Sequence, residues 1–394
     1  MKKKYSAVLA AGIMLLAAPS GVWAAEESSA ANGLGDDIYS FQVEFDGDIL
    51  SVPMTYEELT AMGWEASHPE QLEQMVEANT YVFGIVFEKG DYRLEADMLN
   101  LGINEAPVSE CLAAGITIDA CDFDNDLIGN QVGPDTLMLP GGIAVGTADI
   151  DAIKAAYGEP SDIYENETYS ELTYEKDIYE KVELTVYKET NTLLEVEVTN
   201  FVEPEGFDPG TVSTETPAIV AEYQAPSAPG ADIMDPVVEF MGDLYQLPAP
   251  VSAFEANGWK IQDMGEDAFA EGGGLEFIDM MKDNQTVRFS VYNFTKDAVT
   301  LSNCFVTELD YGTYDPEVLA LKLAGDVTLG VSKDELKAMA EEKGYICEED
   351  EDYLQIYKNE DSRLDDYLSI WFNKDEDPDK AASITVHHEV LENS

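Results

Sequence analysis

The chain has 394 residues, of which 80 are Asp or Glu and 21 are Lys or Arg, giving a formal net charge of −59. A surface this acidic is repelled by nucleic acid and by anionic lipid, so neither is expected as a partner. The charge is compatible with cation binding, with capture of a basic peptide or protein, and with adaptation to a salty medium. A solvated, non-adhesive surface explains it more simply.

Residues 1–24 have the pattern of a secretory signal peptide. Three lysines precede an apolar run from Ala7 to Ala18, and small residues around Ala24 fit a cleavage site. The apolar run is too short to span a bilayer, so no membrane insertion is expected. We expect a secreted, extracellular protein that starts with a flexible leader, residues 25–36. Cleavage removes three Lys and no acidic residue, so the mature charge would be −62.

The sequence contains an internal repeat. Residues 43–65 return at residues 238–260 without a gap, and the two segments agree at nine of 23 positions. Roughly one or two agreements are expected by chance. The shared residues are mostly Gly, Pro, aromatic and apolar, which are residues that determine a fold. The repeat therefore predicts a duplicated architecture and does not identify a ligand.

A Pro-rich segment divides the chain between the two copies. Residues 204–231 combine several prolines with Gly, Ser and Thr, which favours an extended linker over packed structure. The sequence thus predicts two tandem domains, residues 37–203 and 232–394.

Each domain is predicted to have an α+β fold, with a mainly antiparallel sheet and two short helices. In the first copy, Thr55 and Glu58 form a capping box for a helix that ends at Gly63. Pro250 replaces the capping threonine in the second copy. The helix there is predicted to begin at Ser252 instead.

The rear part of each domain repeats a second pattern. Residues 139–146 match residues 323–330, and each segment leads into a helix. The first of these helices ends at Gly158, while Ser332 caps the second and Gly344 ends it. Three alternating strands follow in each copy. This order predicts a meander with one face of its sheet covered.

This rear pattern resembles a module of many exported bacterial proteins. Residues 142–146, a helix ending in Tyr157-Gly158-Glu159-Pro160, and the meander are similar to domains of β-lactamase inhibitory protein and of the small outer-membrane assembly lipoprotein SmpA. Lys343-Gly344-Tyr345 departs from the motif in the second copy. The two-copy layout resembles secreted, uncharacterised proteins of Gram-positive bacteria. The resemblance implies a non-catalytic protein-binding or envelope role.

Four cysteines in an exported chain allow three disulfide pairings. Pairing Cys111 with Cys121 and Cys304 with Cys347 would close one crosslink in each copy, worth on the order of 2–3 kcal/mol. Buried free thiols are an equal alternative. The sequence has no C-x-x-C motif, which disfavours dithiol redox chemistry and structural zinc.

The segment Asp122-Phe-Asp124-Asn-Asp126 matches the first ligand positions of a calcium loop. Leu127 and Gly133 stand where an EF-hand needs its Gly and its bidentate Glu, so the segment is not an EF-hand. Chance clustering among 80 carboxylates explains it more simply than a looser calcium site. That site would use Asp119, Asp122, Asp124 and Asp126.

Catalytic motifs are missing from the sequence. It has three histidines and no G-x-S-x-G, H-E-x-x-H or P-loop pattern. His387 and His388 are expected on opposite faces of a strand, at the surface. Trp64 and Trp259 could form platforms for a sugar or peptide, although their shared place beside a Gly favours a core role.

These patterns favour a secreted, non-catalytic binding or structural protein, envelope-associated or extracellular. Its partner would be a protein, a peptide or a small ligand. The alternatives are a carboxylate-dependent extracellular hydrolase, whose carboxylate pair needs only spatial proximity, and a calcium-stabilised scaffold.

Overall fold

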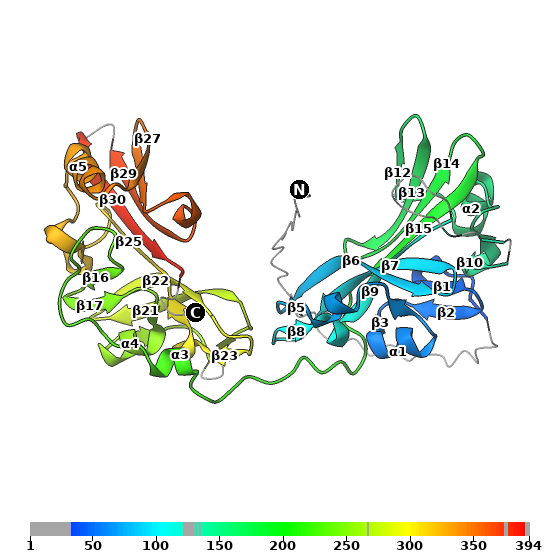
Figure 1. Cartoon of the computed structure of the whole chain (residues 1–394), viewed down its shortest axis with the longest axis horizontal. Helices are drawn as coiled ribbons and strands as arrows, with labels where there is room; N and C mark the ends of the chain where they lie inside the picture. Colours follow the sequence, from blue (N-terminus) through cyan, green and yellow to red (C-terminus); the bar gives the residue numbers. More distant parts are fainter. Residues whose placement is uncertain are drawn as a thin grey trace. The chain divides into compact units, whose positions relative to one another are not determined.

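The structure is a computed structural model that describes residues 33–120, 130, 132–133, 135–265, 268–373 and 377–390. The chain divides into two compact units between Gly210 and Thr211 (Figure 1). We call these unit 1 and unit 2. Residues 1–24, and the leader up to residue 32, lie outside the described residues.

Unit 1 contains two larger antiparallel sheets that share one core, besides the pair β5 (Met75–Val76) and β8 (Ala106–Pro107). The smaller sheet consists of β1 (Gln42–Phe45), β2 (Asp48–Ser51), β10 (Leu137–Leu139) and β11 (Ile143–Ala144). The larger sheet has the order β12-β13-β14-β15-β9-β7-β6-β4, and β3 pairs with β9. Its strands are β3 (Met54–Thr55), β4 (Glu65–Ala66), β6 (Thr80–Lys89), β7 (Tyr92–Asn100), β9 (Leu112–Asp119), β12 (Asp162–Glu165), β13 (Tyr169–Asp177), β14 (Glu180–Tyr187) and β15 (Thr192–Asn200). The α-helices of unit 1 are α1 (Tyr56–Ala61) and α2 (Ile150–Tyr157).

Unit 2 contains one three-stranded and two five-stranded antiparallel sheets, besides the pair β20 (Phe269–Ala270) and β23 (Val299–Thr300). The three-stranded sheet has β16 (Val237–Phe240), β17 (Asp243–Gln246) and β26 (Leu321–Lys322). The first five-stranded sheet has β18 (Ala249–Pro250), β19 (Lys260–Ile261), β21 (Leu275–Lys282), β22 (Gln285–Tyr292) and β24 (Phe305–Val306). The second has the order β25-β30-β29-β28-β27, with strands β25 (Glu308–Gly312), β27 (Ile346–Asp350), β28 (Tyr353–Tyr357), β29 (Asp366–Asn373) and β30 (Asp377–His388). The α-helices of unit 2 are α3 (Ala218–Ala221), α4 (Val251–Ala256) and α5 (Lys333–Lys343).

These elements confirm the expected mainly antiparallel sheets with few helices. The α1 helix has the predicted capping box, because the Thr55 hydroxyl accepts from the Glu58 N–H at 3.1 Å and the Glu58 carboxylate accepts from the Thr55 N–H at 2.8 Å. Ser332 caps α5 in the same way. The start predicted for α4 at Ser252 is wrong, since the helix begins at Val251 directly after Pro250, a position at which proline is well tolerated.

The Pro-rich segment 204–231 is partly packed instead of fully extended. The Pro209 carbonyl accepts from the Ile103 N–H at 2.8 Å in unit 1. In unit 2, Ser213 donates to the Ala298 carbonyl at 2.7 Å, and α3 buries Val220. The segment therefore makes main-chain hydrogen bonds and one buried apolar contact that its proline content does not predict.

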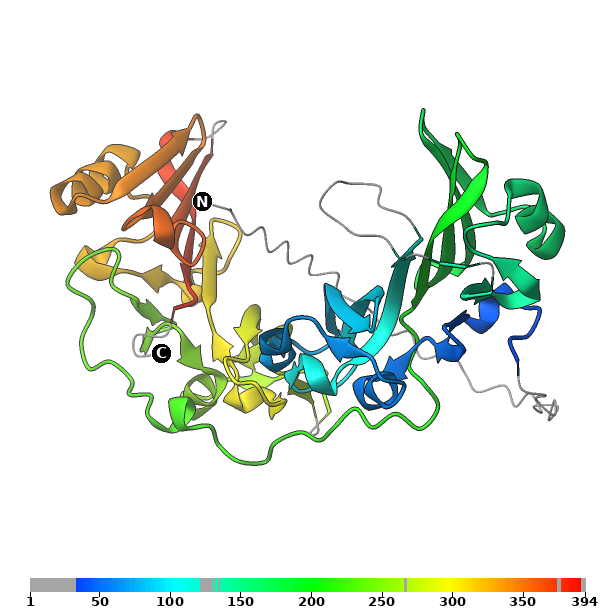
Figure 2. The same ribbon diagram turned by 45° about the vertical axis from the view of Figure 1, so that its right-hand side comes forward.

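The same strand order recurs in both units. The strands β12-β13-β14-β15-β9 in unit 1 and β27-β28-β29-β30-β25 in unit 2 each form a meander whose last strand pairs with a strand from earlier in the chain (Figures 1 and 2). Two buried asparagines also correspond. Asn100 donates from its amide to the carbonyls of Val76, Glu77 and Asn104, and Asn293 donates likewise to Ala270, Glu271 and Asp297.

Candidate binding faces of the two sheets

One face of the large sheet in unit 1 bears the core, and the opposite face is lined by polar side chains. On β9, Ile116 and Ile118 are buried in the core, whereas Thr117 and Asp119 alternate with them and are only partly buried. The same alternation runs across the neighbouring strands. We call the resulting surface the open face of unit 1; it includes Arg93, Glu95, Asp97, Thr117, Asp119, Glu171, Thr173, Lys181, Glu183, Thr185, Glu195 and Glu197.

Acidic groups outnumber basic groups on this open face. Its two cations are already paired, Arg93 with Glu95 at 2.7 Å and Lys181 with Glu183. Partial burial raises the pKa of Asp97 and of Glu197, and nearby carboxylates raise both further. The face therefore carries unpaired, partly desolvated negative charge.

Asp119 and Glu195 form a carboxyl pair on this face. They lie opposite each other across β9 and β15, and their side chains are hydrogen bonded. The Thr185 hydroxyl also donates to Glu195 at 3.0 Å. Burial, and then the hydrogen bond and charge of Asp119, raise the pKa of Glu195 to about 7. Its position beside Asp119 therefore favours the protonated form of Glu195.

The matching face of unit 2 has a different chemistry. On β29, Leu368, Ile370 and Phe372 are buried, while Trp371 between them is 50% exposed. Its indole packs against the Tyr353 ring with a centroid distance of 4.8 Å. We call the corresponding surface the open face of unit 2; it includes Glu308, Asp310, Glu348, Tyr353, Gln355, Tyr367, Ser369, Trp371, Ser383, Thr385 and His387.

Strand register relates the two open faces position by position. Thr185 pairs with Glu195 immediately before a bulge in unit 1, and Trp371 pairs with Ser383 immediately before a bulge in unit 2. On the adjacent strand, Glu171 faces Thr185 as Tyr353 faces Trp371. Aromatic and hydroxyl groups in unit 2 thus stand where unit 1 has Thr and carboxylates.

The two adjacent histidines point to opposite sides of β30, as predicted. His387 lies on the open face, between the carboxylates of Glu308 at 3.3 Å and Glu389 at 3.5 Å. Burial lowers its pKa, but the hydrogen bond and charge of Glu308 outweigh this effect, and the pKa is raised overall. The expectation that both histidines lie at the surface is wrong for His388. It is 2% exposed and its Nδ1 lies 2.7 Å from Asp366, because its side of the strand faces the core.

Neither tryptophan considered from the sequence is a surface platform. Trp64 is fully buried and Trp259 is 1% exposed. Trp64 packs on Phe45 at 5.3 Å, and Trp259 stacks on Phe240 at 5.6 Å with an interplanar angle of 7°. Both are core residues. Among the tryptophans of the described ranges, Trp371 is the exposed one, and it was not a predicted site residue.

The cysteines of the described chain are free thiols. Cys111 and Cys304 are buried at matching places, each directly after a short 3-10 helix, and Cys347 lies on β27. The predicted Cys304–Cys347 crosslink is not formed: both thiols are free, with Cys304 directly before β24 and Cys347 on β27 of another sheet. Cys121 lies outside the described residues.

Thiol labelling should therefore distinguish these cysteines in the native protein. Burial raises the pKa of both Cys111 and Cys304 to about 12, and little thiolate forms at pH 8. We expect Cys347, which is only partly buried, to react with iodoacetamide first, and the other two to react only after unfolding. Peptide mapping by mass spectrometry checks this order. Recovery of a peptide crosslinked through Cys304 and Cys347 would contradict it.

Of the four calcium-site candidates, Asp119 is described, and Asp122, Asp124 and Asp126 lie outside the described residues. Asp119 is hydrogen bonded to Glu195. Within the described part of the chain, no three His, Cys, Asp or Glu side chains are grouped as a metal site requires.

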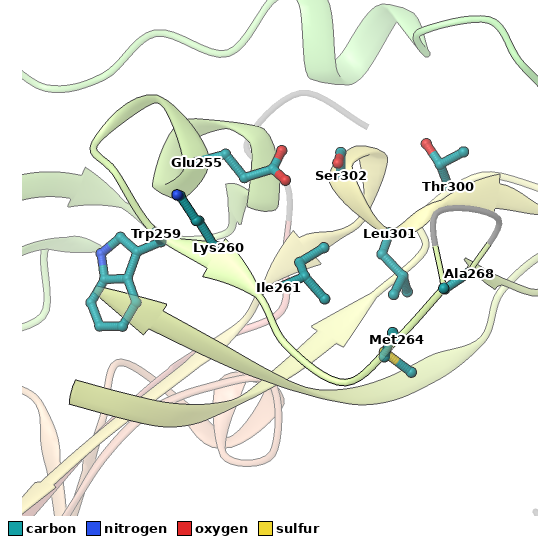
Figure 3. A pocket seen from close by; sticks show the side chains of 10 residues that line it. Glu255, Trp259, Lys260, Ile261, Met264, Ala268, Thr300, Leu301 and Ser302 are labelled. Carbon is teal, nitrogen blue, oxygen red and sulfur yellow. The ribbon is translucent and has the colours of Figure 1, made fainter. Parts of the chain in front are cut away.

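A pocket of about 370 Å³ lies in unit 2, beside the end of α4 (Figure 3). Ile261, Met264 and Leu301 contribute apolar lining, and Trp259 lines it although its side chain is almost wholly buried. Glu255 is the only acidic group among the described lining residues.

No protein-family model, curated protein or solved structure matches this chain. None of the helices in the described ranges has both the length and the apolar character needed to span a membrane.

Proposed function

We propose that the chain is an exported, tandemly duplicated α+β protein that binds a partner through its open faces and catalyses no reaction. The signal-peptide pattern and the internal repeat of the sequence support this proposal. So do the common strand order, the paired asparagines and the matching cysteines of the two units. The resemblance to secreted proteins of Gram-positive bacteria is part of the same proposal.

The observation that carries the binding role is the contrast between the open faces and the cores. Core positions of the two meanders hold similar apolar residues, such as Leu184 and Ile370. Open-face positions at the same register differ in chemistry, as Glu171 and Tyr353 do. Packing alone requires no such difference on a face without core contacts, so we assign the difference to ligand recognition.

A hydrolase is the second candidate because one carboxyl pair has the required chemistry. The pKa of Glu195 is raised, as that of a general acid would be, and Asp119 lies beside it. Their side chains are, however, in hydrogen-bond contact, and glycosidase carboxyl groups are about 5 Å or more apart. We therefore interpret the pair as a contact between two carboxyl groups within the sheet.

Affinity capture from the envelope and secreted proteins of the producing cell tests the binding role. The bait is residues 25–394, compared with a variant that carries Thr173→Arg and Gln355→Arg, one large cation on each open face. We expect the unmodified bait to retain a specific partner and the variant to lose it, because the new side chains obstruct both faces.

The matched control carries Thr190→Arg and Gln285→Arg, which add the same two charges, one in the turn between β14 and β15 and one at the start of β22. Equal retention by all three baits would refute the open faces as the binding surface. A melting temperature that rises with calcium and falls with a chelator would instead favour the calcium-stabilised scaffold.

A further inference from the structure

The strongest feature outside the acidic face of unit 1 is the aromatic pair on the open face of unit 2. Trp371 is 50% exposed and rests against Tyr353, so one ring supports the orientation of the other. The two belong to the central strands β29 and β28, which pair with neighbours on both sides. We call Trp371 and Tyr353 the aromatic platform. Two hydrogen-bonded strands hold it.

Carboxylates flank this platform on two sides. Ser383 lies opposite Trp371, and its hydroxyl donates to Asp310 at 3.1 Å. The same carboxylate oxygen accepts from Thr385 at 2.7 Å, which fixes its position. On the other side, Asp350 lies opposite Tyr353 at the end of β27. A ligand on the platform would therefore lie between two acidic groups.

The described cations near the platform are already engaged. Arg363 makes a bidentate contact with Glu348, with donor–acceptor distances of 2.9 and 2.8 Å. Lys333 donates to the main-chain carbonyls of Asp350 and Glu351. Within the described residues, neither cation is paired with the Asp310 or Asp350 carboxylate, and the Asp310 carboxylate accepts from the hydroxyls of Ser383 and Thr385. Electrostatic complementarity thus favours a cationic ligand.

An arginine side chain fits these features better than other cations do. Its guanidinium is planar, stacks on the faces of Trp and Tyr, and still presents N–H donors to carboxylates at its edge. Sugars also stack on exposed Trp rings, but a neutral sugar would not use the flanking charge. The mature charge of −62 expected from the sequence adds long-range attraction for a basic segment.

We propose that the aromatic platform binds arginine side chains of a basic, extended peptide or protein segment. This inference rests on the proposed binding function and names the chemical class of ligand for unit 2.

Quenching of Trp371 fluorescence tests the inference in the mature chain. Trp23 falls in the predicted signal peptide, and Trp64 and Trp259 are buried, so Trp371 is the tryptophan that acrylamide reaches. The probes are hexa-arginine, hexalysine, hexaglutamate and maltohexaose at physiological salt. We expect hexa-arginine to protect Trp371 from acrylamide, hexalysine to protect it less, and the other two to leave quenching unchanged.

A matched variant separates the platform from the general acidity of the protein. Trp371→Thr installs the residue that unit 1 has at this register, and Tyr314→Ala removes an aromatic residue that is 97% exposed elsewhere in unit 2. Titration calorimetry should show hexa-arginine binding weakened roughly 3- to 10-fold by the first substitution and unchanged by the second.

Three results would overturn the inference: no protection by hexa-arginine, equal affinity for the Trp371→Thr variant, or protection by maltohexaose. The quenching result needs no variant, so it remains decisive if Trp371→Thr does not fold. If affinity capture retains a partner through the open faces while hexa-arginine gives no protection, only the arginine assignment fails. If capture is indifferent to the open-face substitutions, the proposed function itself fails.

Discussion

Replacing Trp259 with Ala is expected to destabilise unit 2 by roughly 3–5 kcal/mol. The side chain is 1% exposed, stacks on Phe240, and contacts Phe289 edge to face at 5.3 Å. Truncation removes this buried apolar surface and leaves a cavity among rings that cannot all move inward. Urea denaturation followed by circular dichroism should show one transition moved to lower urea, while that of unit 1 stays in place.

Two further substitutions serve as controls for this prediction. Trp259→Phe retains most of the buried surface and should cost markedly less. Trp371→Thr changes a half-exposed residue and is expected to alter stability by under about 1 kcal/mol. Equal losses for Trp259→Ala and Trp371→Thr would contradict the distinction between the buried and the exposed tryptophan.

Glu195→Gln is expected to stabilise unit 1 above neutral pH. Burial and the neighbouring Asp119 raise the pKa of Glu195 to about 7, from 4.5 for an unperturbed Glu. The ionised carboxylate is thus disfavoured in the folded state, and the free energy of unfolding should fall as pH rises from about 4.5 through 7. A neutral amide cannot ionise and removes this fall. Allowing for solvent screening of a partly exposed pair, we expect a gain on the order of 1 kcal/mol at pH 8.

The measurement is urea denaturation at pH 5.5 and pH 8. Unmodified unit 1 should be more stable at the lower pH, and the variant should lose much of this difference. Glu167→Gln is the control, because it removes the same charge from an exposed turn. If both substitutions stabilise unit 1 equally at pH 8, general charge repulsion explains the effect and the raised pKa of Glu195 does not.

The sequence predicted those elements that depend only on neighbouring residues. The capping boxes at Thr55 and Ser332 and the meander strands depend on residues within one or two turns, so their pattern was sufficient. The start of α4 was predicted wrongly because a proline can precede a helix without any side-chain cap. The partial packing of residues 204–231 depends on contacts with distant loops, which composition does not encode.

The open faces were harder to predict because the pairing register of the strands, and not the composition, determines which side chains lie together on them. Asp119 and Glu195 are far apart in the chain, and only the pairing of β9 with β15 brings their side chains together. Trp371 had a usable signal, since it alternates with the buried residues Ile370 and Phe372 and so must point away from the core. Trp64 and Trp259 were considered instead because each follows a glycine, and their shared position indicated a role in folding.

The two buried thiols allow the unfolding of each unit to be followed separately by chemical modification. Cys111 in unit 1 and Cys304 in unit 2 are 2% and 0% exposed, and neither has a disulfide partner in the described structure. An alkylating or oxidising reagent reaches either sulfur only when the surrounding unit opens. When modification is slow relative to reclosing, its rate reports how often that unit is open; when it is fast, the rate equals the opening rate itself. The kinetic stability of the two units can therefore be timed separately, in one intact chain and without denaturant.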